Sequence, residues 1–156
     1  MTTYPGPDWI CETREAAWQA RDSQGEMVFD GHMWIFGGWF TPQTPNPRDV
    51  WKSSDGVEWV CATPEAAWVH GDLPATMPFK DRMWLMGGRK LPGAENTNRV
   101  WSSADGADWK LESADPGWCA RVSPSFAVFQ DRMWIMGGTE NFYEDNDTTL
   151  KNDVWS

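Results

Sequence analysis

The sequence is built from an internal repeat of about fifty residues. The phrase GHMWIFGG at residues 31–38 returns as DRMWLMGG at 81–88 and as DRMWIMGG at 131–138. Four columns of tryptophan keep the same spacing, with an insertion of four residues before the last member. The columns are Trp9, Trp59 and Trp109; Trp18, Trp68 and Trp118; Trp34, Trp84 and Trp134; and Trp51, Trp101 and Trp155. Such a period predicts equivalent units stacked side by side.

Within each unit, short β-type runs alternate with turn residues, which predicts four antiparallel strands and no helix. The first strand ends at Phe29, Phe79 or Phe129, and the second is the Met-Trp phrase. The third strand is expected at residues 49–53, 99–103 and 153–156. Asp-Gly pairs at 55–56 and 105–106 favour a tight turn into a fourth strand that carries Trp59 or Trp109.

A pair of glycines closes the second strand of each unit: Gly37 and Gly38, Gly87 and Gly88, and Gly137 and Gly138. Glycine permits a positive φ and lets a neighbouring backbone approach closely. A phosphate-binding loop would need a helix to begin after the glycines, and no helical periodicity follows them. We therefore interpret the glycine pairs and the tryptophan columns as structural.

A fifty-residue period with four strands, a Gly-Gly pair and a tryptophan on the fourth strand resembles the Kelch repeat of β-propellers. The closest likeness is to tryptophan-rich Kelch-like units with the pattern DVW-x-S-x-DG-x-x-W, as at residues 49–59. The resemblance covers the chain and implies one all-β domain, residues 1–156, of three four-stranded antiparallel blades. The repeats fall at about 14–63, 64–113 and 114–156.

The second unit departs from the pattern in two places. Gly71 stands where the other units have Arg21 and Arg121, and Pro78 lies within the expected first strand. Because proline cannot donate a backbone hydrogen bond, we expect a local distortion of this unit.

Three blades are too few to close a propeller, which typically has four to eight. In the repeat alignment the third unit lacks a fourth strand, whereas residues 8–13 form a fourth strand with no unit of their own. Open strand edges and exposed apolar faces favour association. The sequence therefore predicts a homodimer that forms one six-bladed propeller, with residues 8–13 of each protomer completing the third blade of the other. A fragment of a longer gene product and a nine-bladed trimer are the alternatives.

The charge balance narrows the possible partners. The net charge of -10 argues against nucleic acid and against an anionic membrane surface. No signal-type segment and no run of eighteen apolar residues is visible, which leaves a cytoplasmic location as the expectation. Neither a cofactor nor a metal is expected, because His32 and His70 fall on opposite rims and the acidic run at 144–147 lacks the spacing of a calcium loop.

Candidate ligand-binding residues lie in the long connections, which share one rim of an up-and-down propeller. Trp39, Phe40, Phe142 and Tyr143 are aromatic residues of this rim outside the repeat columns, and they serve either ligand contact or loop packing. The resemblance places a second, polar group near the propeller axis. This group comprises Arg21, Arg121, Asp22, Glu26, Asp72 and His70. Arginine can bind a carboxylate as a fork, but structural arginines bonded to loop carbonyls or to Asp22 are the favoured interpretation.

These features favour a non-enzymatic binding or scaffold module that presents the long loops of a dimeric propeller to a protein, peptide, small-molecule or carbohydrate ligand. A lectin assembled from few-bladed chains is one alternative. A cofactor-free sugar epimerase or isomerase, with a polar site at the ring axis, is another. Copper chemistry of the galactose-oxidase type is not expected, because the only tyrosines are Tyr4 and Tyr143.

Overall fold

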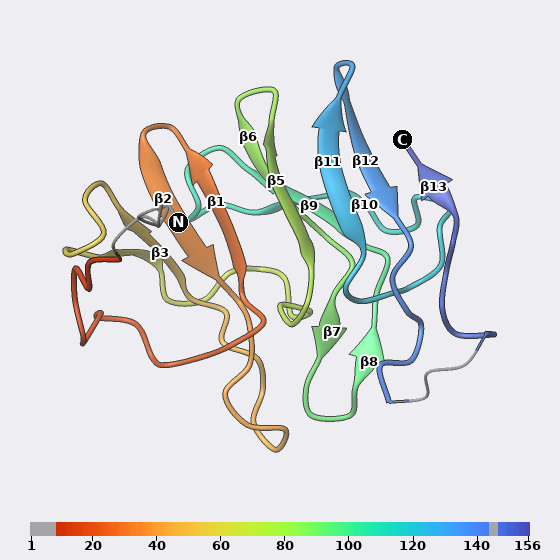
Figure 1. The fold of residues 1–156 in the computed structure, drawn as a ribbon, viewed down its shortest axis with the longest axis horizontal. Coiled ribbons are helices and arrows are strands. Elements are labelled where there is room, and N and C mark those ends of the chain that lie inside the picture. The colour runs from red at the N-terminus through yellow and green to blue at the C-terminus, as the bar shows by residue number, and fades with distance from the viewer. Residues whose placement is uncertain (1–8, 144–146) are drawn as a thin grey trace, which may run out of the picture.

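The computed structural model describes residues 9–143 and 147–156, and within them the fold is all-β, with antiparallel strands. The first sheet has the order β1 (Gly25–Phe29), β2 (His32–Phe36), β3 (Val50–Ser53), β4 (Val60–Thr63). The second has the order β5 (Ala75–Phe79), β6 (Arg82–Met86), β9 (Val100–Ser103), β10 (Lys110–Ser113). The third contains β11 (Ser125–Phe129), β12 (Arg132–Met136) and β13 (Val154–Trp155). The prediction of an all-β chain is confirmed (Figure 1).

A short hairpin, which the sequence analysis did not anticipate, extends from the second sheet. It consists of β7 (Arg89–Lys90) and β8 (Glu95–Asn96), within the connection from β6 to β9. The expected distortion at Pro78 is wrong, because β5 and β6 keep five paired residues in the same register as β1 with β2 and β11 with β12. Pro78 is tolerated since β5 lies at the edge of its sheet, where one side of the strand needs no partner.

The tight turns have a local chemical cause. In the hairpin between β1 and β2, Asp30 and Gly31 have φ of 46° and 69°, the left-handed pair that a two-residue turn requires. After β3, the Ser53 hydroxyl accepts a hydrogen bond from the Gly56 amide at 2.8 Å. The Asp55 carboxylate accepts further bonds from the two amides that follow Gly56. The same bonds recur after β9, so the Ser-x-Asp-Gly sequence encodes this turn.

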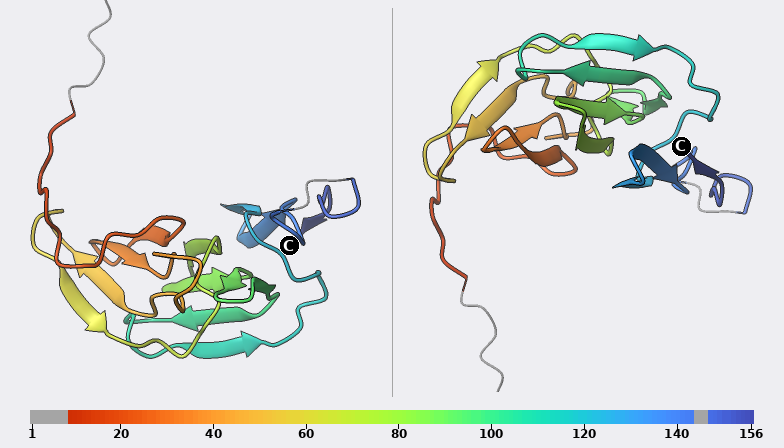
Figure 2. Two further views of the ribbon diagram at one scale, coloured as in Figure 1. Left: turned by 90° about the horizontal axis from the view of Figure 1, so that it is seen from below. Right: turned by 90° about the horizontal axis from the view of Figure 1, so that it is seen from above.

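The three sheets stand side by side, with β5 next to β1 on one side and next to β11 on the other. Seen end-on, these first strands gather on the concave side of an arc, whereas the outer strands β4 and β10 spread along its convex side (Figure 2). Each sheet has two apolar faces. The tryptophan face carries Trp34, Trp84 or Trp134 of the second strand, and the methionine face carries Met33, Met83 or Met133.

The core consists of two equivalent junctions between neighbouring sheets. In each, the tryptophan face of one sheet packs on the methionine face of the next. The buried residues of the first junction are Trp34, Phe36, Val50, Ala66, Trp68, Met83, Leu85 and Trp109. Those of the second are Ala75, Met77, Met86, Val100, Trp118 and Ile135. Aromatic rings dominate the first junction, where Trp68 and Trp109 meet edge to face at 5.9 Å between ring centroids.

The glycine pairs fasten one sheet to the next. The Gly38 amide donates to the Gly71 carbonyl at 2.6 Å, and the Gly88 amide donates to the Arg121 carbonyl at 3.0 Å. A Cβ on Gly38 would lie 2.4 Å from the backbone oxygen of Asp22, and the residue has φ of +84°. Close backbone approach therefore excludes a side chain at this position.

The two ends of the described chain are incompletely packed. β13 pairs with β12 alone, so the third sheet has one strand fewer than its neighbours. Residues 9–13 form no strand, and Trp9 and Ile10 are 95% and 76% exposed. Residue 8, the expected start of this segment, lies outside the described residues. No helix in the described ranges is long and apolar enough to cross a membrane.

We predict that Gly38→Ala destabilises the protein far more than Gly31→Ala does. Both glycines have positive φ, which costs an alanine about 1 kcal/mol, but nothing lies within 4 Å of a Cβ on Gly31. The clash with the Asp22 backbone should add about 1–3 kcal/mol at position 38. Urea unfolding of both variants checks this, and equal midpoints would show that close approach is not the constraint.

Candidate functional site

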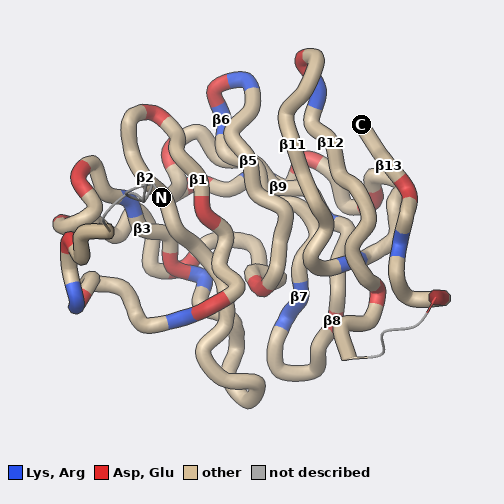
Figure 3. Tube along the Cα trace, viewed as in Figure 1, with Lys and Arg blue, Asp and Glu red and all other residues tan. Residues whose placement is uncertain are grey.

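The long connections lie together at one end of the sheets, around β7 and β8, and the tight hairpin turns lie at the opposite end (Figure 1). β7 places a basic segment at the long-loop end of a chain with a net charge of -10 (Figure 3). The first side chain of β7, Arg89, follows the glycine pair of the second sheet directly. Its position is equivalent to that of Trp39 in the first unit and Thr139 in the third.

Arg89 and Asp72 form a buried ion pair at this end. Their side chains are 5% and 0% exposed, and the Arg89 Nη2 and Asp72 Oδ2 atoms are 2.6 Å apart. The Asp72 Oδ1 and Arg89 Nη1 atoms are also buried, yet neither has a hydrogen-bond partner in the described structure. Burial raises the pKa of Asp72, and the bond from Arg89 offsets only part of this effect. The nearby Asp22 carboxylate raises the same pKa further.

Two exposed aromatic rings cover the Arg89 guanidinium. Its central carbon lies 5.3 Å from the centroid of Phe142 and 5.2 Å from that of Tyr143, within the range of cation–π attraction. The two rings meet edge to face, with an interplanar angle of 88°. Phe142 is 46% exposed and Tyr143 is 68% exposed. The loop of the third sheet is thereby held against the hairpin of the second, with aromatic surface left in water.

A recess of about 300 Å³ opens between this loop and the β7–β8 hairpin. Its lining consists of Arg89, Ala94, Asn96, Glu140, Asn141, Phe142 and Tyr143. The Asn96 amide donates to the Glu140 carbonyl at 2.7 Å, and the Glu140 carboxylate pairs with Lys151 at 2.6 Å. The recess thus combines amide groups, a carboxylate that is ion-paired with a lysine, and two aromatic rings.

The structure brings together only part of the predicted binding set. Phe142 and Tyr143 line the recess, whereas Trp39, Phe40, Asp22, Glu26 and His70 are not among its lining residues. Phe40 is an exposed loop residue, and Trp39 exchanges two backbone hydrogen bonds with Asp22. Arg89 and the two asparagines were not anticipated. Their residue types are common in loops, so only the three-dimensional arrangement singles them out.

His70 is buried. Burial lowers its pKa, and its Nε2 atom has no hydrogen-bond partner among the described residues. The other histidine, His32, lies at the hairpin-turn end, where its Nδ1 atom is 2.7 Å from the Asp30 carbonyl. No three His, Cys, Asp or Glu side chains of the described ranges are grouped so as to hold a metal ion. Residues 144–146 of the acidic run lie outside those ranges.

Arg21 and Arg121 are occupied within the fold. Arg21 forms a two-pronged pair with Asp49, at 2.6 and 2.9 Å, and Arg121 pairs in the same way with Asp153, at 2.5 and 2.7 Å. Both arginine side chains are fully buried. Each also donates to the carbonyl of the first residue of its glycine pair, as Arg21 does to Gly37 at 3.2 Å. The geometry favours the alternative of structural arginines, with these aspartates as partners in place of Asp22.

A third residue extends each pair. The Trp51 indole donates to the Asp49 carboxylate at 2.7 Å, and Trp155 repeats this bond with Asp153. The second unit lacks both members of the ion pair, because Gly71 replaces the arginine and Arg99 replaces the aspartate. Loss of both partners together leaves no buried charge unpaired, because Arg99 is exposed, and this explains how the unit tolerates the change.

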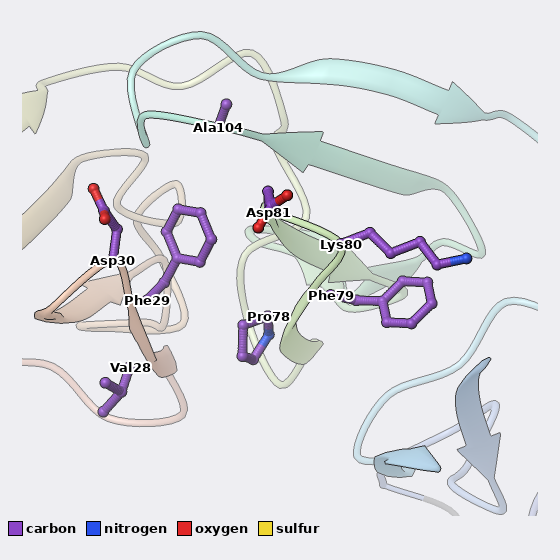
Figure 4. A pocket seen from close by; sticks show the side chains of 8 residues that line it. All are labelled: Val28, Phe29, Asp30, Pro78, Phe79, Lys80, Asp81 and Ala104. Atoms are coloured by element: carbon purple, nitrogen blue, oxygen red, sulfur yellow. The ribbon is translucent and has the colours of Figure 1, made fainter. Parts of the chain in front are cut away.

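A larger recess of about 550 Å³ lies at the hairpin-turn end, which the sequence analysis did not select. It lies between the β1–β2 turn and the β5–β6 turn (Figure 4). Its lining consists of Val28, Phe29, Asp30, Pro78, Phe79, Lys80, Asp81 and Ala104. Lys80 reaches across to Asp131 of the third sheet at 3.4 Å, in a pair exposed to solvent. This recess offers apolar walls with a charged edge, but no buried polar group aimed at a ligand.

Comparison of the sequence with protein-family models and with curated proteins found no match. The function is therefore argued from the geometry of the described residues.

We predict that Asp49→Asn removes an acid-sensitive part of the stability. Burial by itself would raise the pKa of Asp49, but the bonds from Arg21 and Trp51 outweigh it and lower that pKa. A lowered pKa means that the stabilisation is present above the unfolded-state pKa of about 4 and is lost as the pH falls through the folded-state value. Asp49→Asn should lose about 2 kcal/mol at pH 7 and depend less on pH.

Urea midpoints at pH 7 and pH 3 check this prediction. Asp81→Asn, in an exposed turn, is the matched control and should behave like the parent chain. A variant at position 49 whose acid dependence equals that of the parent chain would contradict it.

Proposed function

We propose that the three sheets are blades of a Kelch-like β-propeller and that two chains form one six-bladed ring. Two features support the blade assignment: the first strands gather on the concave side of the arc, and consecutive sheets pack through equivalent faces. A propeller consists of such wedge-shaped sheets arranged around a common axis.

The two outer faces of the arc support the ring. The free methionine face of the first sheet leaves Met33 39% exposed, whereas its counterpart Met83 is fully buried in the first junction. The free tryptophan face of the third sheet leaves Phe129 60% exposed. A recess of about 380 Å³ on that face is lined by Ala127, Phe129, Trp134, Met136 and Val154. Each free face is equivalent to one side of a junction that the chain already forms twice, so the faces of two copies are complementary.

On the concave side of the arc, an equivalent backbone hydrogen bond joins each unit to the next. The Leu73 amide donates to the Ser23 carbonyl at 3.0 Å, and the Ser123 amide donates to the Leu73 carbonyl at 3.1 Å. These three residues occupy equivalent positions of the three units and all have positive φ. In the ring, the Ser123 carbonyl accepts the next bond of the series from the partner's Ser23.

The ring functions as a binding module through its long-loop end. The observation that carries this proposal is the exposed Phe142–Tyr143 pair over the buried Arg89, beside a recess of about 300 Å³. Exposed aromatic rings near an anchored arginine are typical of recognition surfaces. The epimerase alternative is less favoured, because Arg21 and Arg121 are already paired with half-buried carboxylates.

A carbohydrate is the ligand class that the lining fits best. Aromatic rings can pack against the apolar face of a sugar, and the asparagine side chains can both donate hydrogen bonds to its hydroxyl groups and accept them. Asn96 and Asn141 stand beside Phe142 and Tyr143 in the recess. A peptide remains the other ligand class within the proposed function.

We predict that the purified chain has twice the mass of a single chain. Burial of the two free apolar faces in two identical junctions supplies the driving force for association. Light scattering coupled to size exclusion over a dilution series measures the mass. A stable species of 17.8 kDa at every concentration would contradict the ring.

We predict that Phe142→Ser with Tyr143→Ser weakens ligand binding at least about tenfold, which corresponds to about 1.4 kcal/mol. The parent chain is first screened on a glycan array and on a peptide library, and the hits are then titrated by calorimetry. Val60→Ser, which alters an exposed apolar residue of the outer strand β4, is the control. A ligand whose affinity is unchanged by the double substitution would place the binding site elsewhere.

A further inference from the structure

An apolar cavity of about 190 Å³ lies at the second junction, beneath the open edge of β13. It is lined by Met86, Val100, Pro116, Trp118, Met133, Ile135, Trp155 and Ser156. Apolar surface makes up most of this lining, and the cavity is partly open to solvent. A hole of this size within a junction forfeits packing contacts that protein interiors normally make.

The first junction shows what is missing from the second. When each lining residue is replaced by its equivalent one repeat earlier, seven of the eight become residues that form the first core cluster or pack against it. They become Phe36, Val50, Ala66, Trp68, Met83, Leu85 and Trp101. In that cluster the same space is filled by Trp109, which is 7% exposed and lies 5.5 Å from the Phe36 ring and 5.9 Å from the Trp68 ring.

Trp109 comes from the approach to the fourth strand of its sheet, and the third sheet has no fourth strand in the described structure. The next tryptophan in that column, read around the ring, is Trp9. Its side chain is 95% exposed. The structure therefore contains an unfilled tryptophan site and an unburied tryptophan of the matching column.

We propose that Trp9 of a second copy fills this cavity while residues 9–13 of that copy pair with β13. This inference rests on the two-chain ring proposed above and specifies how each junction between chains closes. In the complete sheets, Lys52 pairs with Val60 and Trp51 with Cys61. The equivalent register puts the partner's Ile10 opposite Ser156 and the partner's Cys11 opposite Trp155.

The course of the chain explains why the occupant is a second copy. Residues 9–13 leave the first sheet and lead away from the arc, far from the C-terminal strand β13 (Figure 2). Residues 14–24 connect this segment to β1, just as the equally long stretch 64–74 connects β4 to β5. A partner segment docked on β13 therefore delivers the partner's first sheet to the free tryptophan face of the third sheet.

Trp9→Ala tests the cavity directly. Because Trp9 is exposed in the single chain, the variant should fold normally, with an unchanged far-ultraviolet dichroism spectrum. Its dimer dissociation constant should rise at least about thirtyfold, as expected for an aromatic side chain central to an interface. Val60→Ala, which truncates an exposed residue of the complete first sheet, should leave the constant unchanged.

A peptide added in trans tests the same site without the ring. The peptide covers residues 7–14 with Cys11→Ser, and it is titrated into the Trp9→Ala chain. Saturable binding that is lost when the peptide itself carries Trp9→Ala supports the cavity as the docking site. Absence of binding overturns it.

A disulfide trap tests the register. In a Cys11→Ser background, Ile10→Cys with Ser156→Cys should form a covalent species of doubled mass on mild oxidation. The pair Val60→Cys with Ser156→Cys is the control and should not, because Val60 lies on the face of the first sheet that is turned away from the proposed junction. Trapping by the control alone would overturn the register.

The outcomes separate this inference from the ring. A parent dimer that Trp9→Ala leaves equally tight, with no peptide binding, overturns the cavity proposal and leaves the ring standing. A parent chain that is monomeric at every concentration overturns the ring, whereas peptide binding to it would still support the cavity. A monomeric chain that binds no peptide overturns both.

Discussion

The structure depends on one constraint, which is that every sheet has two apolar faces and can bury both only between neighbours. The tryptophan face of one sheet meets the methionine face of the next, twice in this chain, and most buried apolar side chains belong to these two junctions. A single sheet of this kind would expose too much apolar surface to be stable. The burial of a side chain therefore depends on which sheet carries it and not on residue type alone. Met83 is fully buried in the middle sheet, whereas its equivalent Met33 in the first sheet is half-exposed.

Polar groups set the spacing between these faces. The glycine pairs permit backbone contact between consecutive sheets, and the Arg21–Asp49 and Arg121–Asp153 pairs hold the adjoining connections in place. The second unit lacks the ion pair and has the β7–β8 hairpin and the Asp72–Arg89 pair in the same region. The hairpin and the buried ion pair of the candidate site thus occur in the unit whose sequence departs most from the repeat.

Much of the fold could be predicted because strand, turn and glycine signals are local and recur three times. The Ser-x-Asp-Gly turn, for example, is held by bonds among residues adjacent in sequence. The candidate site was harder to predict. The partners of Arg21 and Arg89 lie 28 and 17 residues away along the chain. For Arg21, the signal in the sequence was co-occurrence across the repeats: Arg21 and Arg121 come with Asp49 and Asp153, whereas the second unit has Gly71 and Arg99. At Pro78 the sequence predicted a distortion that the structure does not have. The effect of a proline depends on whether its strand lies at a sheet edge, which the local sequence does not specify.

The unlike faces at the two ends of the arc have a consequence for assembly size. When identical molecules join through two different surfaces, the contact itself does not fix the number of molecules in the assembly. A closed ring forms only when the rotation from sheet to sheet divides a full turn evenly, and a helical filament forms otherwise. If two chains join through these faces as proposed, the angle between sheets decides whether a closed ring or a polymer forms. That angle depends on the bulk of side chains such as Trp68 and Trp109 within the junctions. In the proposed ring, core substitutions that change this angle would therefore change how many chains assemble and leave the fold of each chain intact.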